Sequence, residues 1–186
     1  MKPILTEQDY QGAARLLGCA VAAIKAVAEV ESAGTGFLCN DEPKILFERH
    51  TFHRLTAGRF DAQYPDISNP VAGGYGNPGE QHKRLKRAAA LDHQAALMAT
   101  SWGKFQILGL NFKLAGFAGL QLFVNAMYTS EPAHLLAFCN FIRNTGLLAA
   151  LRAQNWPAFG KGYNGPQYKK NRYDLKMKAA YERYSK

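Results

Sequence analysis

The sequence predicts a predominantly helical α+β fold, formed as a single domain over residues 1–186, with a small β-hairpin beside a central helix. The chain has 186 residues, which is long enough for one domain with a sizeable core. Hydrophobic residues make up 47% of it, which is typical of a globular chain. Apolar residues recur at helical spacing in most segments, and only residues 37–48 are predicted to be extended.

In the first half of the chain, each predicted element has a local start or stop signal. Thr6 and Asp9 resemble a capping box that opens a helix ending near Leu17. A second helix is expected from Ala20 to Ala33, where Gly34 and Gly36 stop it. Residues 37–48 contain a turn at 40–43 and are expected to form the hairpin. A helix over 49–56 follows, and then a long loop over 59–79 of the kind that is often functional.

The second half of the chain is predicted to be helical almost throughout. Helices are expected at residues 80–99 (interrupted near Asp92), 102–108, 120–128, 131–144, 146–154 and 167–184. The sequence shows no internal repeat and no linker.

Composition excludes several classes of protein and leaves the role of the positive charge open. The three cysteines lack CxxC spacing and are expected to be reduced, and no metal and no cofactor are expected. No signal peptide and no transmembrane run are predicted. The net charge of +9 gathers at residues 82–87 and 169–186, either to attract an anionic polymer or as solvated helix faces.

Two glutamates near the end of the second helix are predicted to differ in setting. Val21, Ile24, Val27 and Ala28 share one apolar face, and Glu31 falls near its middle. Glu29 lies on the opposite face, where we expect it to pair with Lys25. Burial disfavours an ionised carboxyl, so the pKa of Glu31 should rise. A carboxyl that is still protonated near pH 7 is what a general acid requires.

Four motifs along the chain resemble one enzyme family. They are V-E-S-A-G-T-G-F at 30–37, L-F-E-R-H-T-F at 46–52, S-W-G-K-F-Q-I-L-G at 101–109 and Y-N-G-P at 163–166. In this order they resemble the N-acetylmuramidase domain of phage endolysins, within the lysozyme superfamily that includes goose-type lysozymes and lytic transglycosylases. The resemblance covers nearly the whole chain and implies a lysozyme-like fold.

The resemblance implies hydrolysis of the β-1,4 bond between N-acetylmuramic acid and N-acetylglucosamine in peptidoglycan. Glu31 would be the general acid, the role that its apolar setting also predicts. An endolysin would be made in the host bacterial cytoplasm and reach the periplasm through a holin. We expect a monomer without a separate wall-binding module and with no nucleic-acid partner.

The residue that positions the attacking water is left open by the sequence. Related phage lysozymes often carry an aspartate nine residues after the glutamate, and here that position is Asn40, followed by Asp41. The preferred arrangement has Asn40 and Thr100 hold the water, with Asp41 as the carboxylate candidate. Asn40 and Asp41 are equally well explained as turn residues. Glu48 is either a second carboxylate in the cleft or one partner of a structural ion pair.

Further positions of the motifs correspond to sugar-binding positions of the superfamily. Gln106, Tyr163 and Asn164 offer amide and phenol groups that suit N-acetyl sugars, and Tyr163 and Asn164 could instead form only a turn. Ser101 belongs to the same set. Phe37 and Trp102 would either stack against a sugar or pack in the core, and for Trp102 we favour the core with one edge on the cleft.

Three alternatives remain at this stage. A lytic transglycosylase would use Glu31 as both acid and base and would form 1,6-anhydro products without water, and a chitinase-like activity is a weaker possibility. A non-enzymatic basic protein that binds nucleic acid or a membrane is the alternative from another class. The basic tail after Lys169 either binds an anionic outer-membrane surface or, as we favour, packs an apolar stripe on the core.

Overall fold

A computed structural model describes residues 1–32, 34–166 and 168–186. Its elements are α1 (Glu7–Leu17), α2 (Val21–Glu31), β1 (Ile45–Phe47), α3 (Arg49–Leu55), η1 (Pro78–Glu80), α4 (Gln81–Leu91), α5 (His93–Met98), β2 (Thr100–Trp102), β3 (Ile107–Leu108), η2 (Gly109–Asn111), α6 (Leu120–Met127), α7 (Glu131–Asn144), α8 (Leu148–Arg152), α9 (Trp156–Asn164) and α10 (Tyr173–Tyr184). The predicted helical α+β class is confirmed. The predicted helix ends at Ala33 and Gln167 lie outside the described residues.

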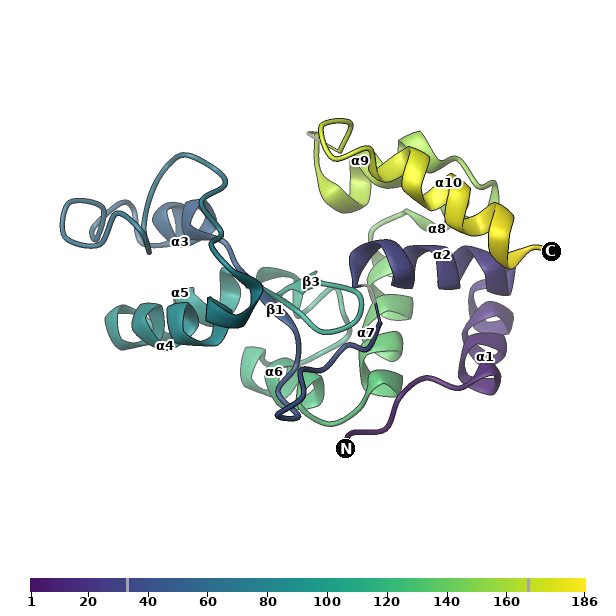
Figure 1. Ribbon diagram of the computed structural model, residues 1–186, viewed down its shortest axis with the longest axis horizontal. Helices are drawn as coiled ribbons and strands as arrows, with labels where there is room; N and C mark the ends of the chain where they lie inside the picture. The colour runs from purple at the N-terminus through teal and green to yellow at the C-terminus, as the bar shows by residue number, and fades with distance from the viewer. Residues whose placement is uncertain (33, 167) are drawn as a thin grey trace.

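The helices form two groups with the small sheet between them (Figure 1). Helices α3, α4 and α5, together with the long loop after α3, make up one end of the molecule. Helices α1, α2 and α7 to α10 make up the other end. Helix α2 runs toward the sheet, so its last residue, Glu31, lies where the two groups approach.

The sheet has three antiparallel strands in the order β1-β2-β3. Ile45 pairs with Trp102, and Trp102 pairs with Ile107. The predicted β element is therefore present, but residues 37–43 add only an isolated bridge between Phe37 and Pro43. The prediction of a helix over 102–108 is wrong, because this segment is a β-hairpin whose turn contains Gly103 at φ 70°.

Most predicted helices are confirmed, and one was missed. Thr6 and Asp9 form the expected capping box, and Asp92 separates α4 from α5 by accepting a hydrogen bond from the Ala95 amide at 3.0 Å. Helix α9 was missed, although Asn155 caps it by accepting from the Ala158 amide at 3.2 Å. Its two glycines, Gly160 and Gly162, weaken the helical pattern in the sequence.

Helix α10 packs along α2, the helix that carries Glu31. Met177 and Ala180 bury the inner face of α10, as predicted for the tail. The expected pair between Lys25 and Glu29 is wrong: Lys25 binds Glu7 at 2.5 Å, and Glu29 accepts hydrogen bonds from Arg183 and Tyr184. None of the helices formed by the described residues has the length and apolar character needed to cross a membrane.

Candidate active site

Glu31 is the last residue of α2 and is half-buried. Burial raises its pKa to about 7, while a hydrogen bond from Asn164 acts in the opposite direction. The amide Nδ2 of Asn164 donates to Glu31 Oε1 at 2.7 Å. The position at a helix C-terminus adds to the effect of burial, because the negative end of the helix dipole disfavours a carboxylate. Glu31 therefore holds its proton to higher pH than an ordinary glutamate does.

The last turn of α9 brings Asn164 and Tyr163 to Glu31. The Tyr163 hydroxyl donates to the Phe105 carbonyl at 2.6 Å, and its ring stacks on Phe159 at a centroid distance of 5.3 Å. Burial and the charge of Glu31 raise the pKa of Tyr163 well above its ordinary value. Asn164 Oδ1 is buried without a hydrogen-bond partner among the described residues, so it is free to accept from a bound ligand.

A cavity of about 380 Å³ opens beside Glu31. Its walls come from four segments, namely the end of α2, the segment before and within β1, the stretch from the loop before η1 to the start of α4, and the β2–β3 turn. The lining residues are Glu31, Ser32, Leu38, Lys44, Ile45, Leu46, Gly76, Pro78, Gln81, His82 and Gln106. Four segments distant in the sequence thus form one polar and apolar cleft, the usual setting for a binding site.

Gln106 enters the cavity from the turn between β2 and β3. Its backbone is left-handed, with φ 47°, and its amide Nε2 donates to the Gly103 carbonyl at 2.8 Å and the Lys44 carbonyl at 3.3 Å. These bonds fix the amide plane and leave the side-chain oxygen pointing away from the two carbonyls. An unusual backbone conformation at a pocket residue is typical of a functional position.

Glu48 follows β1 and is held by several donors. Its Oε1 accepts from the Ser101 hydroxyl at 3.2 Å, and its Oε2 accepts from the Thr51 hydroxyl at 3.0 Å. His50 Nε2 lies 3.5 Å from Oε2. The Glu48 side chain is 20% exposed, so solvent reaches it in spite of these partners.

Tyr75 and Tyr173 connect the surroundings of the two carboxyls. Burial raises the pKa of Tyr173, and the negative charges of Glu31 and Glu48 both raise it further. Burial and the charge of Glu48 raise the pKa of Tyr75. Glu31 and Glu48 therefore both lie near the Tyr173 phenol at the start of α10, and Tyr75 from the long loop lies near Glu48.

The turn after Glu31 is fixed from the N-terminus of α7. Glu131 Oε1 accepts from the Gly36 amide at 2.5 Å, and the Lys104 ammonium donates to the Gly34 carbonyl. His134 Nδ1 accepts from the Lys104 amide at 3.1 Å. A Cβ on Gly36 would lie 2.9 Å from the His134 ring, so this close packing requires glycine.

The three residues predicted to accompany Glu31 around a water are not brought to the cavity. Asn40 donates to Glu42 Oε2 at 2.7 Å, and Asp41 lies at φ 63° with its carboxylate 3.4 Å from the N-terminal amine. These contacts match the alternative prediction of a turn. Thr100 is fully buried, and its hydroxyl donates to the Ala96 carbonyl at 2.9 Å.

The two aromatic residues that were predicted either to stack against a sugar or to pack in the core lie in the core. Phe37 packs on His134 with ring centroids 5.0 Å apart. Trp102 is 1% exposed, and its indole Nε1 donates to the Leu97 carbonyl at 3.2 Å. This burial corrects the expected edge on the cleft, and it leaves neither ring a surface on which a sugar could stack.

Sequence reasoning missed the part of the cavity built by the loop before α4. Gly76, Pro78, Gln81 and His82 line the cavity, and Tyr75 lies near Glu48. Gln81 joins the loop to the sheet, because its Nε2 donates to the Tyr75 carbonyl at 2.6 Å and its Oε1 accepts from the Phe47 amide at 3.0 Å. The length and composition of the loop were the available signal, but they did not single out individual residues.

The chain matches the N-acetylmuramidase family over residues 20–185. No curated protein matches it. Among solved structures, it is similar to one described as the crystal structure of Burkholderia AP3 phage endolysin, with a TM-score of 0.87 and 43% identity. That alignment covers 98% of this chain and 71% of the endolysin chain. The family match and the structural similarity, both spanning nearly the whole chain around the Glu31 cavity, show that the chain belongs to the N-acetylmuramidase family of glycoside hydrolases.

Proposed function

We propose that the protein is an endolysin that cleaves the β-1,4 bond between N-acetylmuramic acid and N-acetylglucosamine, with Glu31 as the general acid. The observation that carries the proposal is the pKa of about 7 of a carboxyl that lines the cavity. At neutral pH a large share of Glu31 is protonated and can donate to the glycosidic oxygen. Asn164, hydrogen-bonded to the same carboxyl, stabilises the anion that remains after donation.

For the attack of water, which displaces the glycosidic oxygen as Glu31 protonates it, we propose Glu48 as the base that takes the water proton. It is solvent-accessible, it is oriented by the Ser101 and Thr51 hydroxyls, and it shares the neighbour Tyr173 with Glu31. Two carboxyls in different environments are the usual arrangement in glycosidases. Asn40 and Thr100 do not support this role, because an amide and a hydroxyl cannot take the proton of water, and the Asp41 carboxylate lies against the N-terminal amine.

The transglycosylase alternative gives Glu48 a different role. In that reaction Glu31 acts as both acid and base, and the muramic acid 6-hydroxyl replaces water. Glu48 would then have only a structural role through Ser101 and Thr51. The products separate the two alternatives, because hydrolysis leaves reducing muramic acid ends and transglycosylation leaves 1,6-anhydro ends. The non-enzymatic alternative is not kept, since the family is one of glycoside hydrolases.

The test is mass spectrometry of soluble products from purified peptidoglycan treated with the wild type, Glu31→Gln and Glu48→Gln. Glu29→Gln is the matched control, because Glu29 lies on the exposed side of the same helix. We expect reducing muramic acid ends from the wild type and the control, and a loss of about 10²- to 10⁴-fold in rate for Glu31→Gln. Anhydro ends would refute the hydrolase proposal, and an active Glu31→Gln variant would refute the role of Glu31.

We further propose that the protein acts as a monomer on peptidoglycan after holin-mediated passage from the host cytoplasm to the periplasm. The similarity to a phage endolysin supports this course. The exposed face of α10, with Lys176 and Lys178, is the surface that we propose for contact with an anionic outer membrane. Reversing both charges to glutamate should reduce lysis of intact cells and leave hydrolysis of purified peptidoglycan unchanged.

A further inference from the structure

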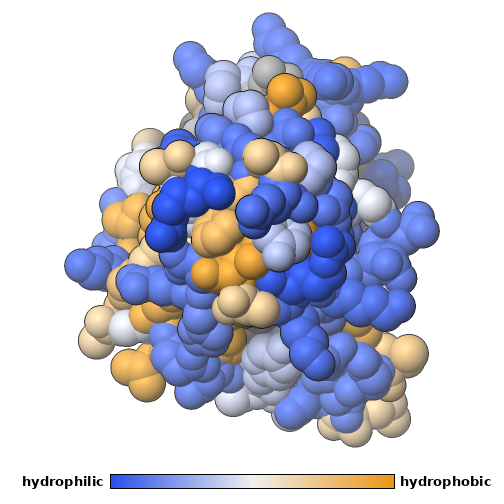
Figure 2. All heavy atoms as spheres, turned by 90° about the vertical axis from the view of Figure 1, so that its left-hand side faces the viewer, coloured by the Kyte–Doolittle hydropathy of each residue, from blue (hydrophilic) through white to orange (hydrophobic). Residues whose placement is uncertain are grey.

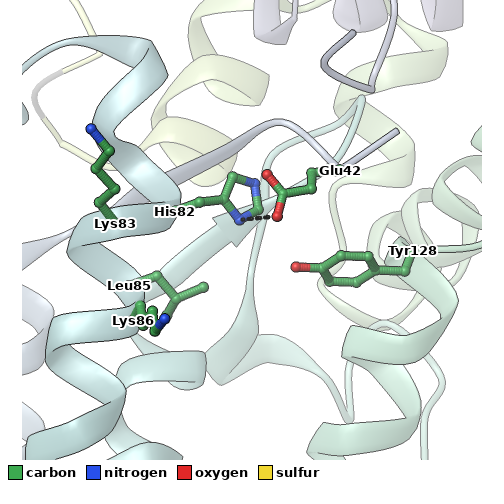
Figure 3. Close-up of a pocket in the computed structure, with 6 residues that line it drawn as sticks. All are labelled: Glu42, His82, Lys83, Leu85, Lys86 and Tyr128. Atoms are coloured by element: carbon green, nitrogen blue, oxygen red, sulfur yellow. Dashed lines mark ion pairs between the residues drawn. The ribbon is translucent and has the colours of Figure 1, made fainter. Parts of the chain in front are cut away.

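A second pocket adjoins the cavity of Glu31. It has a volume of about 420 Å³ and is lined by Glu42, His82, Lys83, Leu85, Lys86 and Tyr128 (Figure 3). His82 lines both pockets, so the two share one wall. A substrate that is branched next to the bond cleaved at Glu31 could therefore occupy both at once.

The basic run at residues 82–87 is divided between two faces of α4. Arg84 donates to the carbonyls of Gly74 at 2.8 Å and Asp66 at 2.6 Å, and Arg87 forms an ion pair with the Asp66 carboxylate at 2.6 Å. These arginines hold the long loop in place. The loop lies at the end of the molecule that faces the viewer in Figure 2, where the surface is mostly hydrophilic with a small apolar group of atoms at the centre of the view. The charge of the two arginines has a structural role.

The lysines of the same run serve the other face. Lys83 forms an ion pair with Glu80 at 3.1 Å. Lys86 is exposed, lines the second pocket and makes no ion pair or hydrogen bond with any residue that the structure describes. A cation at a pocket wall without an anionic partner is available to a ligand.

The wall opposite Lys86 carries a carboxylate and a phenol. Figure 3 shows the Glu42 carboxylate directed at the His82 ring, from which it is separated by 3.9 Å, and the Tyr128 hydroxyl pointing into the pocket. Tyr128 is fixed by its ring contact with Trp102, with centroids 6.2 Å apart. The pocket thus has a basic side and an acidic side, with Leu85 between them. This pattern suits a ligand that carries both an ammonium and a carboxylate.

We propose that this pocket binds the peptide stem of peptidoglycan, with a stem carboxylate on Lys86 and the ammonium of a diamino acid residue on Glu42. The inference rests on the proposed function, because it assumes that the glycan strand occupies the Glu31 cavity. Peptide stems branch from muramic acid, one of the two sugars at the cleaved bond. A stem leaving the cavity at His82 therefore reaches a pocket whose two charges complement its own.

The test compares Lys86→Ala with the wild type on two substrates, namely whole peptidoglycan and glycan strands whose peptides an amidase has removed. Losing one charge-assisted contact should lower kcat/KM on whole peptidoglycan about five- to tenfold. On the stripped strands the variant and the wild type should be equal. Glu42→Gln should show the same selectivity. Lys178→Ala, which removes an exposed lysine on α10, is the matched control and should behave as the wild type on both substrates.

Two results would overturn the inference. An equal loss on both substrates would show that Lys86 acts on the glycan or on the fold, and no loss on either would show that the stem does not bind there. A salt-dependent loss shared by Lys178→Ala would indicate general attraction to an anionic polymer, which also contradicts a stem pocket. Failure of the wild type to cleave either substrate would refute the muramidase proposal itself. This outcome is distinguishable from a failure of the stem-pocket inference, in which the wild type still cleaves both substrates.

Discussion

Glu31 and Glu131 lie at opposite kinds of helix end, so the helix dipole acts on their carboxyls in opposite directions. Glu131 begins α7, where the positive end of the helix dipole favours an anion. It accepts hydrogen bonds from the backbone amides of Gly36 at 2.5 Å and Leu5 at 2.8 Å. Glu31 ends α2, where the dipole disfavours an anion, and Asn164 is its one donor among the described residues.

The difference shows that burial by itself does not decide how many donors a buried carboxyl has. Glu131 is 3% exposed and more buried than Glu31, yet two backbone amides donate to its carboxyl and hold it in place. Glu31 has too few donors to offset the loss of water, so it keeps a proton that it can give away. Number and type of donors therefore separate the chemistry of Glu31 from the structural role of Glu131.

The largest expected effect on stability comes from Glu131→Gln. The new amide group would face one of the two backbone amides, so one hydrogen bond to a charged acceptor is lost and a buried donor is left unpaired. We expect the free energy of unfolding to fall by about 2–3 kcal/mol. Chemical denaturation of the variant and the wild type at pH 7 measures this difference in the free energy of unfolding.

The control for that variant is Glu29→Gln, which removes an exposed carboxylate paired with Arg183. Surface pairs of this kind contribute about 0–1 kcal/mol. If Glu131→Gln were no more destabilised than this control, Glu131 would not be the anchor of the turn after Glu31.

A smaller and opposite effect is expected for Glu31→Gln. The folded-state pKa of Glu31, about 7, lies above the ordinary value of 4.5, so ionising it in the folded protein costs stability. This cost is absent below pH 4.5 and grows until the pH exceeds 7. Since Glu31 is partly exposed, we expect its ionisation to lower the free energy of unfolding by about 2 kcal/mol at most. Glu31→Gln should match the wild type near pH 4 and exceed its stability by that amount at pH 8.5. Denaturant midpoints at both pH values decide this, and a variant less stable at pH 8.5 would contradict it.

The contrast between the two glutamates also marks what sequence could predict. The apolar face of α2 singled out Glu31, because the spacing of residues along one helix is local information. The expected pair of Lys25 with Glu29 failed for the complementary reason, since Glu7 and Arg183 are better placed and come from other helices. Likewise, no local pattern links Glu131 to the amide of Gly36.

The same limit explains the errors in secondary structure. Residues 102–108 have apolar spacing that fits a short helix, but pairing of Thr100–Trp102 with Ile45–Phe47 makes them part of a sheet. That pairing buries Thr100 and Trp102 and removes both from the cavity. The basic run at 82–87 is similar, because the partners of Arg84 and Arg87 lie in the loop before η1 and could not be assigned from composition.

The smallest predicted effect concerns the hydrogen bond that Asn164 donates to Glu31, which sets Glu31 apart from the two backbone donors of Glu131. This bond lowers the pKa of Glu31 against the effect of burial, so Asn164→Ala should raise it. Because the general acid works only while protonated, activity falls as pH rises through this pKa. The alkaline limb of the kcat/KM profile should therefore move to higher pH, by roughly 0.5–1 unit.

Gln106→Ala, which changes the cavity without touching Glu31, should lower kcat/KM and leave the limb in place. A limb that stays fixed or moves to lower pH in Asn164→Ala would show that another group controls it, and Glu31 would then lose its claim to be the acid.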